Sequence, residues 1–439
     1  MRRTAILYAL LFSVAVSAQE PFTLEEAIQQ ALANSPTLKV QKMKNKATSI
    51  EVEESRLQYI PDIYLSGDMR RNLVIPATPV PAHVFDPSAA EGELMYLKFN
   101  TKYNSSAGIN LRFDIFNPEK INQVAQKKQQ QKLQEYDTEI AEEDLKERVA
   151  LAYAECVIAD EQQKMLKRDT AYYALLLRNA NELYLKDKIN LSSKNDAHRA
   201  YNESVATYLE AEKIAGDRKA ELLYLMGLDI TATNVTSLLL ADDIPTLLST
   251  LEKKATPTNN PTFREVLRQQ EVVDLATLRL KSASWKYAPT LTLNGYYGTN
   301  YYNHTLTPFN NNLWRGNSYI GISLKVPVIQ SFSTSKEVSR LRLQQLMEQE
   351  NLRDIRNSQE KERLNDLSML QLRKENYRLN KENWEMSQLN ESAVQVQFEK
   401  GYIQQSDLLS ERMKIHQSRQ RFLQSAYDLF SILITLGME

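Results

Sequence analysis

Cysteine, long apolar runs and aromatic residues are all scarce in this chain. Of its 439 residues only Cys156 is a cysteine, so an internal disulfide is excluded. The apolar stretch Ala5–Val16 is shorter than the roughly 20 residues that a membrane-spanning helix needs, and no later stretch approaches that length, so we expect no transmembrane helix. Aromatic residues make up 8% of the chain and charged residues 25%, which suits helices that face water on two sides better than a compact core.

Residues 1–18 are predicted to be a secretory signal peptide. Two arginines precede the apolar run, and small residues precede the expected cleavage after Ala18. Loss of Arg2 and Arg3 takes the formal net charge from −1 to −3, which argues against a nucleic-acid partner. Because Cys156 lies inside a predicted helix and not directly after the signal, we expect a buried structural thiol and no lipidation of the mature N-terminus.

Glycine and proline are missing from two long stretches. Neither occurs between Pro118 and Gly216, and between Pro327 and Gly437 the only one is Gly401. Because both residues interrupt helices, each stretch predicts a helical hairpin whose first arm has roughly 66 residues, about 100 Å at 1.5 Å per residue. The predicted helices are 119–185 and 191–227 around a turn near Asp187, and 333–399 and 402–437 around a turn near Gly401.

The sequence also contains an internal repeat. Residues 34–37, 59–67, 108–112, 184–189 and 225–227 return as 259–262, 287–295, 321–325, 398–403 and 435–437, with an offset that stays between 210 and 228 residues. A nearly constant offset indicates a tandem duplication. We therefore predict repeat 1 at 19–227, a connector with one small helix at 228–260, and repeat 2 at 261–439. Each repeat is predicted to begin with a helix, at 36–60 and at 261–287.

Between the helices of each repeat, apolar and polar residues alternate at every second position. This period predicts four strands, at 62–75, 101–116, 290–302 and 317–328. A transmembrane barrel with a water-filled lumen and a soluble β-sandwich both show such alternation. The predicted signal peptide and the aromatic residues near the strand ends favour the membrane.

The number of strands bears on the number of copies. Open sheet edges are not tolerated in hydrocarbon, and four strands cannot close a barrel. A dimer would supply eight strands, whose interior is filled by side chains, whereas a trimer would supply twelve and leave an open lumen. The long helices contain wholly polar runs such as 356–363, with no apolar face to bury. They favour a helical tube with water on both sides, although an isolated coiled coil has the same composition.

Together these features resemble the TolC-like outer membrane efflux proteins of Gram-negative bacteria. The resemblance covers nearly the whole mature chain, and it is carried by the repeat, by the turn 398–401 followed by Ser406-Asp407-Leu408-Leu409, and by prolines that open helices and strands: Pro36, Pro61, Pro261 and Pro289. It implies an α+β membrane protein that forms a homotrimer, with a 12-stranded β-barrel in outer-membrane lipid and a long periplasmic α-helical barrel. It further implies a tip that docks on a periplasmic adaptor (membrane fusion) protein and on an inner-membrane RND, ABC or MFS pump.

The resemblance also implies functional residues at the tip. Relatives narrow the tip with two acidic rings; counted from Gly401, the first position is Asp407 and the second is Ser410, with Glu411 beside it. Three symmetry-related carboxylates around a narrow mouth would attract cations and discourage anions, but an aspartate at a helix start also serves as a cap, and both roles fit. The implied adaptor-docking turns are Lys186, Asp187, Lys188 and Ile189, and Lys400, Gly401, Tyr402 and Ile403.

Two features of the tip depart from the relatives. The tyrosine, arginine and aspartate contacts that hold their hairpins closed fall here on Phe398, Ile403 and Ser193, so that set of contacts is not expected. Asp187 replaces the expected glycine of the first turn. Because Asp and Asn tolerate left-handed backbone better than most residues, we expect Asp187 or Asn190 to make the turn instead.

No catalytic pattern is present in the sequence. Gly-x-Ser-x-Gly, Gly-x-x-x-x-Gly-Lys, His-Glu-x-x-His and paired cysteines are all absent. The histidines have no ligand spacing, and we assign them surface or structural roles: His83, His198, His304 and His416. We expect no enzyme activity, no cofactor and no metal site.

The leading hypothesis is a passive exit duct in the bacterial outer membrane, extending into the periplasm, that conducts small molecules exported by an inner-membrane pump through a periplasmic adaptor. An outer-membrane channel of type I protein secretion has the same architecture and a different cargo. A soluble periplasmic coiled-coil adaptor or scaffold without a pore is the alternative from another class, and an outer-membrane enzyme is a more distant one.

Overall fold

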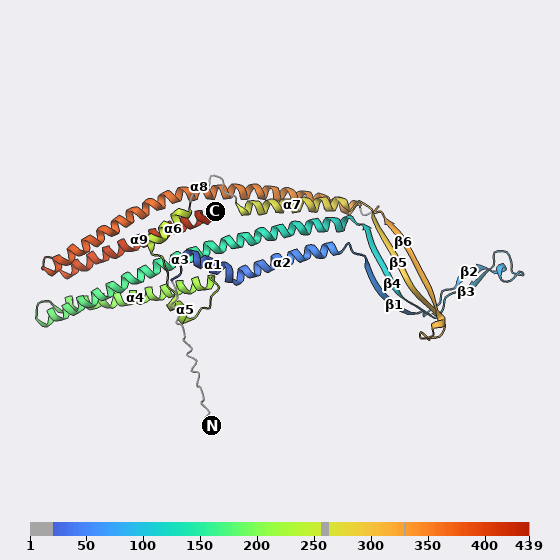
Figure 1. Ribbon diagram of the computed structural model, residues 1–439, viewed down its shortest axis with the longest axis horizontal. Helices are drawn as coiled ribbons and strands as arrows, with labels where there is room; N and C mark the ends of the chain where they lie inside the picture. Colours follow the sequence, from blue (N-terminus) through green and yellow to red (C-terminus); the bar gives the residue numbers. More distant parts are fainter. Residues whose placement is uncertain (1–20, 256–262, 329–330, 439) are drawn as a thin grey trace, which may run out of the picture. The chain divides into compact units, whose positions relative to one another are not determined.

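The computed structural model describes residues 21–255, 263–328 and 331–438 (Figure 1). The predicted signal peptide at 1–18 and Pro261 lie outside the described residues. The chain divides into two compact units. The strand unit comprises Lys44–Glu135 and Arg268–Arg353, and the helical unit takes its described residues from Met1–Met43, Tyr136–Leu267 and Asp354–Glu439.

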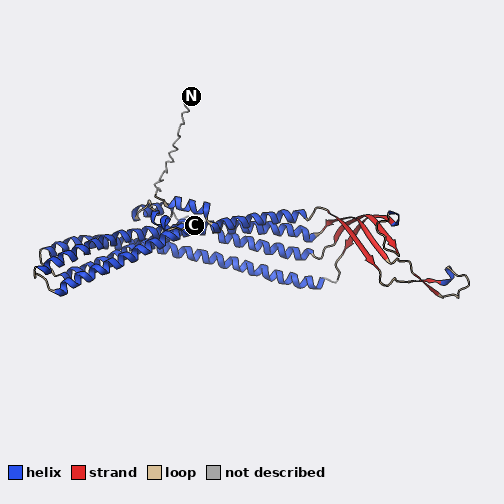
Figure 2. Cartoon of the chain, turned by 90° about the horizontal axis from the view of Figure 1, so that it is seen from below, coloured by secondary structure: helices blue, strands red, loops and turns tan. Residues whose placement is uncertain are grey.

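Four strands of the strand unit form one antiparallel sheet in the order β1, β4, β5, β6 (Figures 1 and 2). The central pair, β4 and β5, joins the two halves of the sequence repeat. In the described part of the chain this sheet is open, with β1 and β6 at its edges. The strands are β1 (Asp62–Arg71), β4 (Tyr103–Phe116), β5 (Thr290–Asn303) and β6 (Trp314–Lys325).

Two of the strand predictions are wrong at their ends. The strand predicted at 62–75 stops at Arg71, because Asn72 instead closes the strand end: its N–H donates to Lys102 O and its side-chain amide to Thr101 O, both at 2.8 Å. The strand predicted at 317–328 begins three residues earlier and ends before Pro327, which has no N–H to donate to a ladder. The other two strands lie within two residues of the predicted bounds at 101–116 and 290–302.

Between β1 and β4 the chain forms a small second sheet that the sequence does not predict. Strand β2 (Thr78–Pro81) pairs antiparallel with β3 (Leu94–Leu97), and the 3-10 helix η1 (Ala82–Val84) lies in their connection. A second 3-10 helix, η2 (Asn311–Leu313), connects β5 to β6. The alternation is too short in these segments to stand out from a polar loop.

The two faces of the four-stranded sheet differ in chemistry. On the apolar face Leu65 is 80% exposed and Ile320 is 74% exposed. The opposite face carries polar side chains and tyrosines, and Asn110 there donates to the Ser66 hydroxyl at 2.7 Å. One polar face and one uncovered apolar face are what a strand between water and lipid requires.

The described helices account for most of the chain, and α2, α3, α7 and α8 contribute to both units. None of them combines the length and apolar character that a membrane-spanning helix requires. Their bounds are α1 (Leu24–Asn34), α2 (Pro36–Leu57), α3 (Pro118–Leu185), α4 (Leu191–Leu225), α5 (Ala232–Ser237), α6 (Ile244–Lys254), α7 (Arg264–Trp285), α8 (Ser331–Glu399) and α9 (Gln405–Met438).

Several helix predictions need correction. The helix predicted at 36–60 ends at Leu57 and the one predicted at 261–287 ends at Trp285, because turns precede the strands. The helix predicted at 191–227 ends at Leu225, before Gly227 takes a left-handed φ of 69°. The helix predicted at 402–437 begins at Gln405. Helix α1 is not predicted, and the connector holds two helices, α5 and α6, where one is expected.

The core of the helical unit lies where α1, α3, α6 and α9 pack together, and it includes the fully buried Tyr153 and Phe430. The hydroxyl oxygen of Tyr153 lies 2.8 Å from both Phe22 O and the Asp242 carboxylate. Burial and the Asp242 carboxylate raise the pKa of Tyr153. This hydroxyl therefore contacts both the segment before α1 and the connector. The same two segments also form a parallel bridge between Phe22 and Leu240.

Candidate functional site

The two hairpins of the helical unit turn with the same backbone geometry. Asp187 has φ 55° and Gly401 has φ 76°, both left-handed. In the first turn Asp187 N–H donates to Tyr184 O and Lys188 N–H to Leu183 O; in the second, Gly401 N–H donates to Phe398 O and Tyr402 N–H to Gln397 O, all between 2.9 and 3.0 Å. This pattern is the Schellman motif. The aspartate thus takes the glycine's place, as its tolerance of left-handed backbone allows.

The predicted docking residues lie mostly at the surface of these turns. Lys186, Asp187 and Lys188 are exposed in the first turn, and Lys400, Gly401 and Tyr402 are exposed in the second. Ile189 and Ile403 are half-buried. Ile403 packs against a small apolar cluster behind the turn, formed by Tyr173, Leu176 and Leu408. The side chains that these turns offer to a partner are therefore three lysines, one aspartate and one tyrosine.

The predicted aperture residues lie on the first turns of α9. Asp407 is exposed, and its carboxylate accepts a hydrogen bond from Gln404 N–H at 3.2 Å. In one copy of the chain Asp407 therefore acts at the helix start. Ser410 is exposed, and Glu411 pairs with Lys414 at 2.6 Å. The acidic ring depends on neighbouring copies and stays a prediction.

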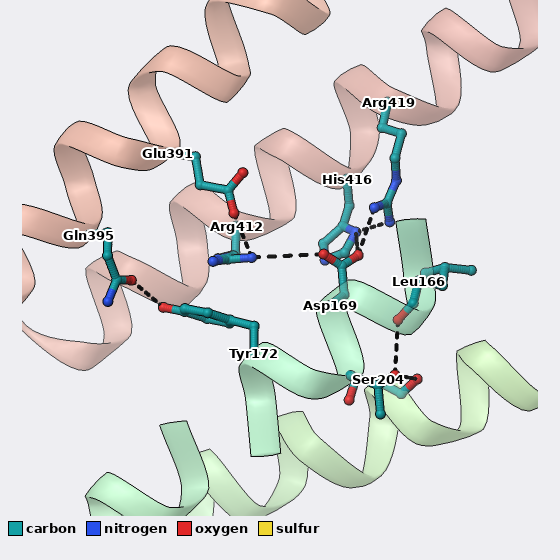
Figure 3. A network of polar contacts seen from close by, with 10 residues as sticks. Leu166, Asp169, Tyr172, Ser204, Glu391, Gln395, Arg412, His416 and Arg419 are labelled. Carbon is teal, nitrogen blue, oxygen red and sulfur yellow. Dashed lines mark hydrogen bonds and ion pairs between the residues drawn. The ribbon is translucent and has the colours of Figure 1, made fainter. Parts of the chain in front are cut away.

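A polar network that the sequence analysis missed lies in helices behind the turns (Figure 3). Asp169 of α3 is its centre. Its carboxylate lies 2.7 Å from Arg419, 3.5 Å from His416 and 3.9 Å from Arg412, all three from α9. The side chains of Arg412 and Arg419 are only 7% and 6% exposed, and that of Asp169 is 14% exposed. The two buried guanidinium groups thus share one partly buried carboxylate.

Helix α8 joins the same network through Arg412. Arg412 Nη1 lies 2.7 Å from the carboxylate of Glu391 on α8. The guanidinium carbon lies 3.5 Å from the centre of the Tyr172 ring, within the range of a cation–π contact. The Tyr172 hydroxyl in turn donates to Gln395 at 2.6 Å. We call Asp169, Tyr172, Glu391, Gln395, Arg412, His416 and Arg419 the Asp169 network.

His416 is held in its neutral form. Arg419 Nη2 lies 2.6 Å from His416 Nδ1, and because arginine carries only donors, that nitrogen must accept. Burial lowers the pKa of His416; Asp169 opposes the shift, whereas Arg419 and Arg412 support it. A groove of about 460 Å³ between α3, α4 and α9 opens beside the imidazole, so water can reach it.

The network joins the two halves of the repeat, and the duplication does not give a second copy of it. The offset of 214 residues that relates Asp187 to Gly401 relates Asp169 to Asn383. The same offset places His198 and Val205 at the positions of Arg412 and Arg419. Repeat 1 therefore supplies the acid, repeat 2 supplies the cations, and the reverse pair does not exist.

The sequence does hold a signal for this network. Buried positions on α9 follow a heptad spacing of four and three residues, and two of them are arginines: Leu408, Arg412, Ile415, Arg419, Phe422, Ala426, Leu429 and Leu433. Charged residues at seam positions require partners, because a buried charge is costly unless it is paired. The positions next to the turns, Phe398, Ile403 and Ser193, give no indication of these two arginines.

A group of three or more histidine, cysteine, aspartate or glutamate side chains that could hold a metal ion is not found among the described residues. Cys156 is buried in the core, where burial and the nearby Asp160 raise the pKa of its thiol to about 12. A thiol with that pKa is inert at neutral pH.

Comparisons with known proteins agree with the predicted resemblance. Residues 27–228 match the family model described as outer membrane efflux protein. A comparison with curated proteins gives no match.

Solved structures share the fold at low sequence identity. The CmeC outer membrane channel of Campylobacter jejuni is 15% identical, with a TM-score of 0.73 over 94% of this chain and 85% of that chain. The outer membrane protein VceC of Vibrio cholerae is 14% identical, with a TM-score of 0.70 over 94% and 95% of the two chains. The open state of the MtrE outer membrane channel of Neisseria gonorrhoeae is 15% identical, with a TM-score of 0.68 over 94% and 88%.

The predicted resemblance and the predicted outer-membrane localisation are thereby confirmed, and the family and neighbours are channel proteins rather than enzymes. Residues 27–228 of this chain therefore match the outer membrane efflux protein family, and the chain shares its fold with solved outer membrane channels.

Proposed function

We propose that three copies of this chain form an exit duct through the outer membrane, which passively conducts small molecules exported by an inner-membrane pump and handed over by a periplasmic adaptor. The observation that carries the proposal is the open four-stranded sheet with one polar and one uncovered apolar face, in a chain whose residues 27–228 match the outer membrane efflux protein family model. In a homotrimer the apolar face would contact lipid and the polar face would line the lumen.

The free sheet edges support a trimer. Strands β1 and β6 leave their outer backbone groups without a ladder partner in the sheet, and in hydrocarbon such groups must be satisfied. Pairing β6 of one copy with β1 of the next closes the sheet, and three copies give twelve strands and an open lumen, whereas two give a barrel filled by side chains. The long helices would continue the duct as an α-helical barrel in the periplasm.

The Asp169 network supports a tip that closes and opens. It binds α3 to α8 and α9 through two buried arginines, so it holds the two hairpins of one copy together. The positions that the repeat relates to Asp169, Arg412 and Arg419 are Asn383 on α8 and His198 and Val205 on α4, and these side chains cannot form the same network. We therefore place the opening movement at the junction between neighbouring copies.

The exposed turns are the proposed docking sites for the adaptor. Lys186, Lys188 and Lys400 give them positive charge, and Tyr402 gives an exposed aromatic ring, a residue type that is enriched in protein interfaces. Asp407 at the start of α9 would face its symmetry mates and favour cations.

Bilayer recordings test the duct directly. Detergent-extracted protein should run as a trimer and should give stable, passive conductance in a planar bilayer, higher when Asp407→Asn removes the acidic ring's effect on anions. Stable trimers without conductance in either protein would contradict the duct, and a protein that stays in the soluble periplasmic fraction would support the scaffold instead.

The cargo is tested in cells. A deletion strain should accumulate small toxic compounds and should recover when the chain is restored. Loss of an exported protein with unchanged accumulation of small compounds would assign the channel to type I protein secretion.

A further inference from the structure

Three tyrosines and one asparagine form a row across the four-stranded sheet. The strand register pairs Tyr64 with Asn110, Asn110 with Tyr296, and Tyr296 with Tyr319. These residues therefore lie at one level on β1, β4, β5 and β6. All four belong to the polar face, because each alternates along its strand with residues of the opposite face, such as the exposed Leu65. We call Tyr64, Tyr296 and Tyr319 the tyrosine row.

Two glycines make room for Tyr296 to lie flat on the sheet. Gly108 and Gly298 face each other in the next row. A methyl group at Gly298 would lie 2.6 Å from the Tyr296 hydroxyl oxygen, and one at Gly108 would lie 2.8 Å from its ring carbons. Glycine at such a position in a strand permits a close approach. The ring therefore covers the glycine pair and points along the wall rather than away from it.

The rest of the row continues this surface. The Tyr296 and Tyr319 ring centroids are 6.0 Å apart, and their planes are only 24° from parallel. Tyr64 and Tyr319 are exposed. The Tyr296 hydroxyl oxygen is buried and, within the described residues, has no hydrogen-bond partner. At Tyr296 the row therefore offers the face of the ring, and not the hydroxyl group, to the space in front of the sheet.

The ion pairs of the strand unit do not attract cations to the row from a distance. Asp68 lies 3.4 Å from Arg70, and Asp114 lies 2.8 Å from Lys120 and 3.8 Å from Arg112. Two acids and three cations leave one net positive charge among these groups. Contact with the aromatic faces, and not long-range attraction, must therefore retain a cation at the row.

We propose that the tyrosine row is a binding site for planar aromatic cations that pass through the channel. Aromatic faces carry the negative part of the ring quadrupole and attract cations, and flat rings stack on one another in offset geometry. The inference rests on the proposed function, since the three tyrosines of each copy become nine at one level of the wall only in a trimer. Several weak contacts at one level slow a solute without trapping it.

Single-channel recording tests this site in the reconstituted full-length protein. Ethidium, a planar aromatic cation, should interrupt the current for longer than tetraethylammonium or naphthalene-1,5-disulfonate, which lack the ring system or the positive charge. Tyr296→Leu should shorten the ethidium interruptions about threefold to fivefold, as expected for the loss of one cation–π contact of ordinary strength. Tyr319→Leu should act in the same direction and serves as a second variant if Tyr296→Leu does not assemble.

The matched control is Tyr297→Leu, which changes the neighbouring tyrosine on the opposite, exposed face. It should leave the ethidium interruptions unchanged. Equal interruption times in Tyr296→Leu, Tyr319→Leu and Tyr297→Leu, or equal retention of the cation and the disulfonate, would overturn the binding site while leaving the duct intact. Trimers that conduct no current at all would overturn the duct, and the binding site with it.

Discussion

Replacing Asp169 by Asn is the sharpest test of the Asp169 network. The change keeps the size of the side chain and one acceptor oxygen but removes the negative charge between Arg412, His416 and Arg419. Arg412 keeps Glu391 at 2.7 Å, whereas Arg419 keeps only His416. One buried guanidinium charge is then left without an anionic partner.

The size of the effect follows from burial. Breaking a buried ion pair by removing one partner costs about 3–5 kcal/mol. Because the Asp169 side chain is 14% exposed and asparagine still accepts a hydrogen bond, we expect about 2–3 kcal/mol of local stability to be lost. At 1.4 kcal/mol per factor of ten, the amides of α9 around residues 408–420 should exchange with deuterium about 30- to 150-fold faster.

Asp196→Asn provides the matched control. Asp196 pairs with Arg199 at the surface of α4, where the side chains are 39% and 79% exposed, and an exposed pair of this kind contributes between 0 and about 1 kcal/mol. Hydrogen–deuterium exchange measured by mass spectrometry on the detergent-solubilised protein compares the two. If Asp169→Asn changes α9 no more than Asp196→Asn does, the network does not hold the hairpins and the reasoning fails.

Three further outcomes are expected. His416 has a folded-state pKa below its unfolded value of 6.5, so the unfolded helix takes up a proton first and the amides of α9 should lose protection from exchange as pH falls from about 7 to 5. The charged groups that face His416 are Asp169, Glu203, Arg412 and Arg419. His416→Gln should flatten this pH dependence. Asp187→Val should destabilise the first turn by about 1–2 kcal/mol, because a β-branched residue resists a φ of 55°, whereas Asp187→Gly should not, as exchange at the end of α3 will show. Tyr153→Phe leaves Asp242 without its buried donor and should lower stability by about 1–3 kcal/mol in thermal unfolding, compared with Tyr208→Phe at the surface.

The long elements could be predicted from the sequence because each rule is local. A stretch without glycine or proline has few ways to end a helix, and α3 begins and ends within one residue of its predicted bounds at 119–185. The period of two set the strands in the same way, since one uncovered apolar face and one polar face leave little freedom in register. The short helices α1, α5 and α6 were missed or undercounted, because their signals are capping residues such as Thr23 and Asp243 rather than long periods.

The candidate site resisted prediction for a different reason. Asp169 and Arg419 are 250 residues apart in sequence, and no local sequence pattern predicts their contact. The tyrosine row has the same origin, because Tyr64 and Tyr319 come to one level only through three successive strand pairs. The heptad spacing on α9 predicts which arginines are buried, but only the packing of α3 against α9 shows that Asp169 is their partner.

Duplication of the sequence gives two similar hairpins, and the substitutions since then have made their junctions different. In the proposed trimer, a symmetric protein with an acid also at 383 and arginines also at 198 and 205 would have this network both within and between copies, and opening would need all of these networks to break. Here position 383 is Asn and position 198 is His, so in the proposed trimer the Asp169 network can form within a copy but has no counterpart between copies. Breaking a buried pair is far more costly than separating neutral polar side chains. The two hairpins of one copy should therefore move as a block, and the cheaper movement is the one between copies.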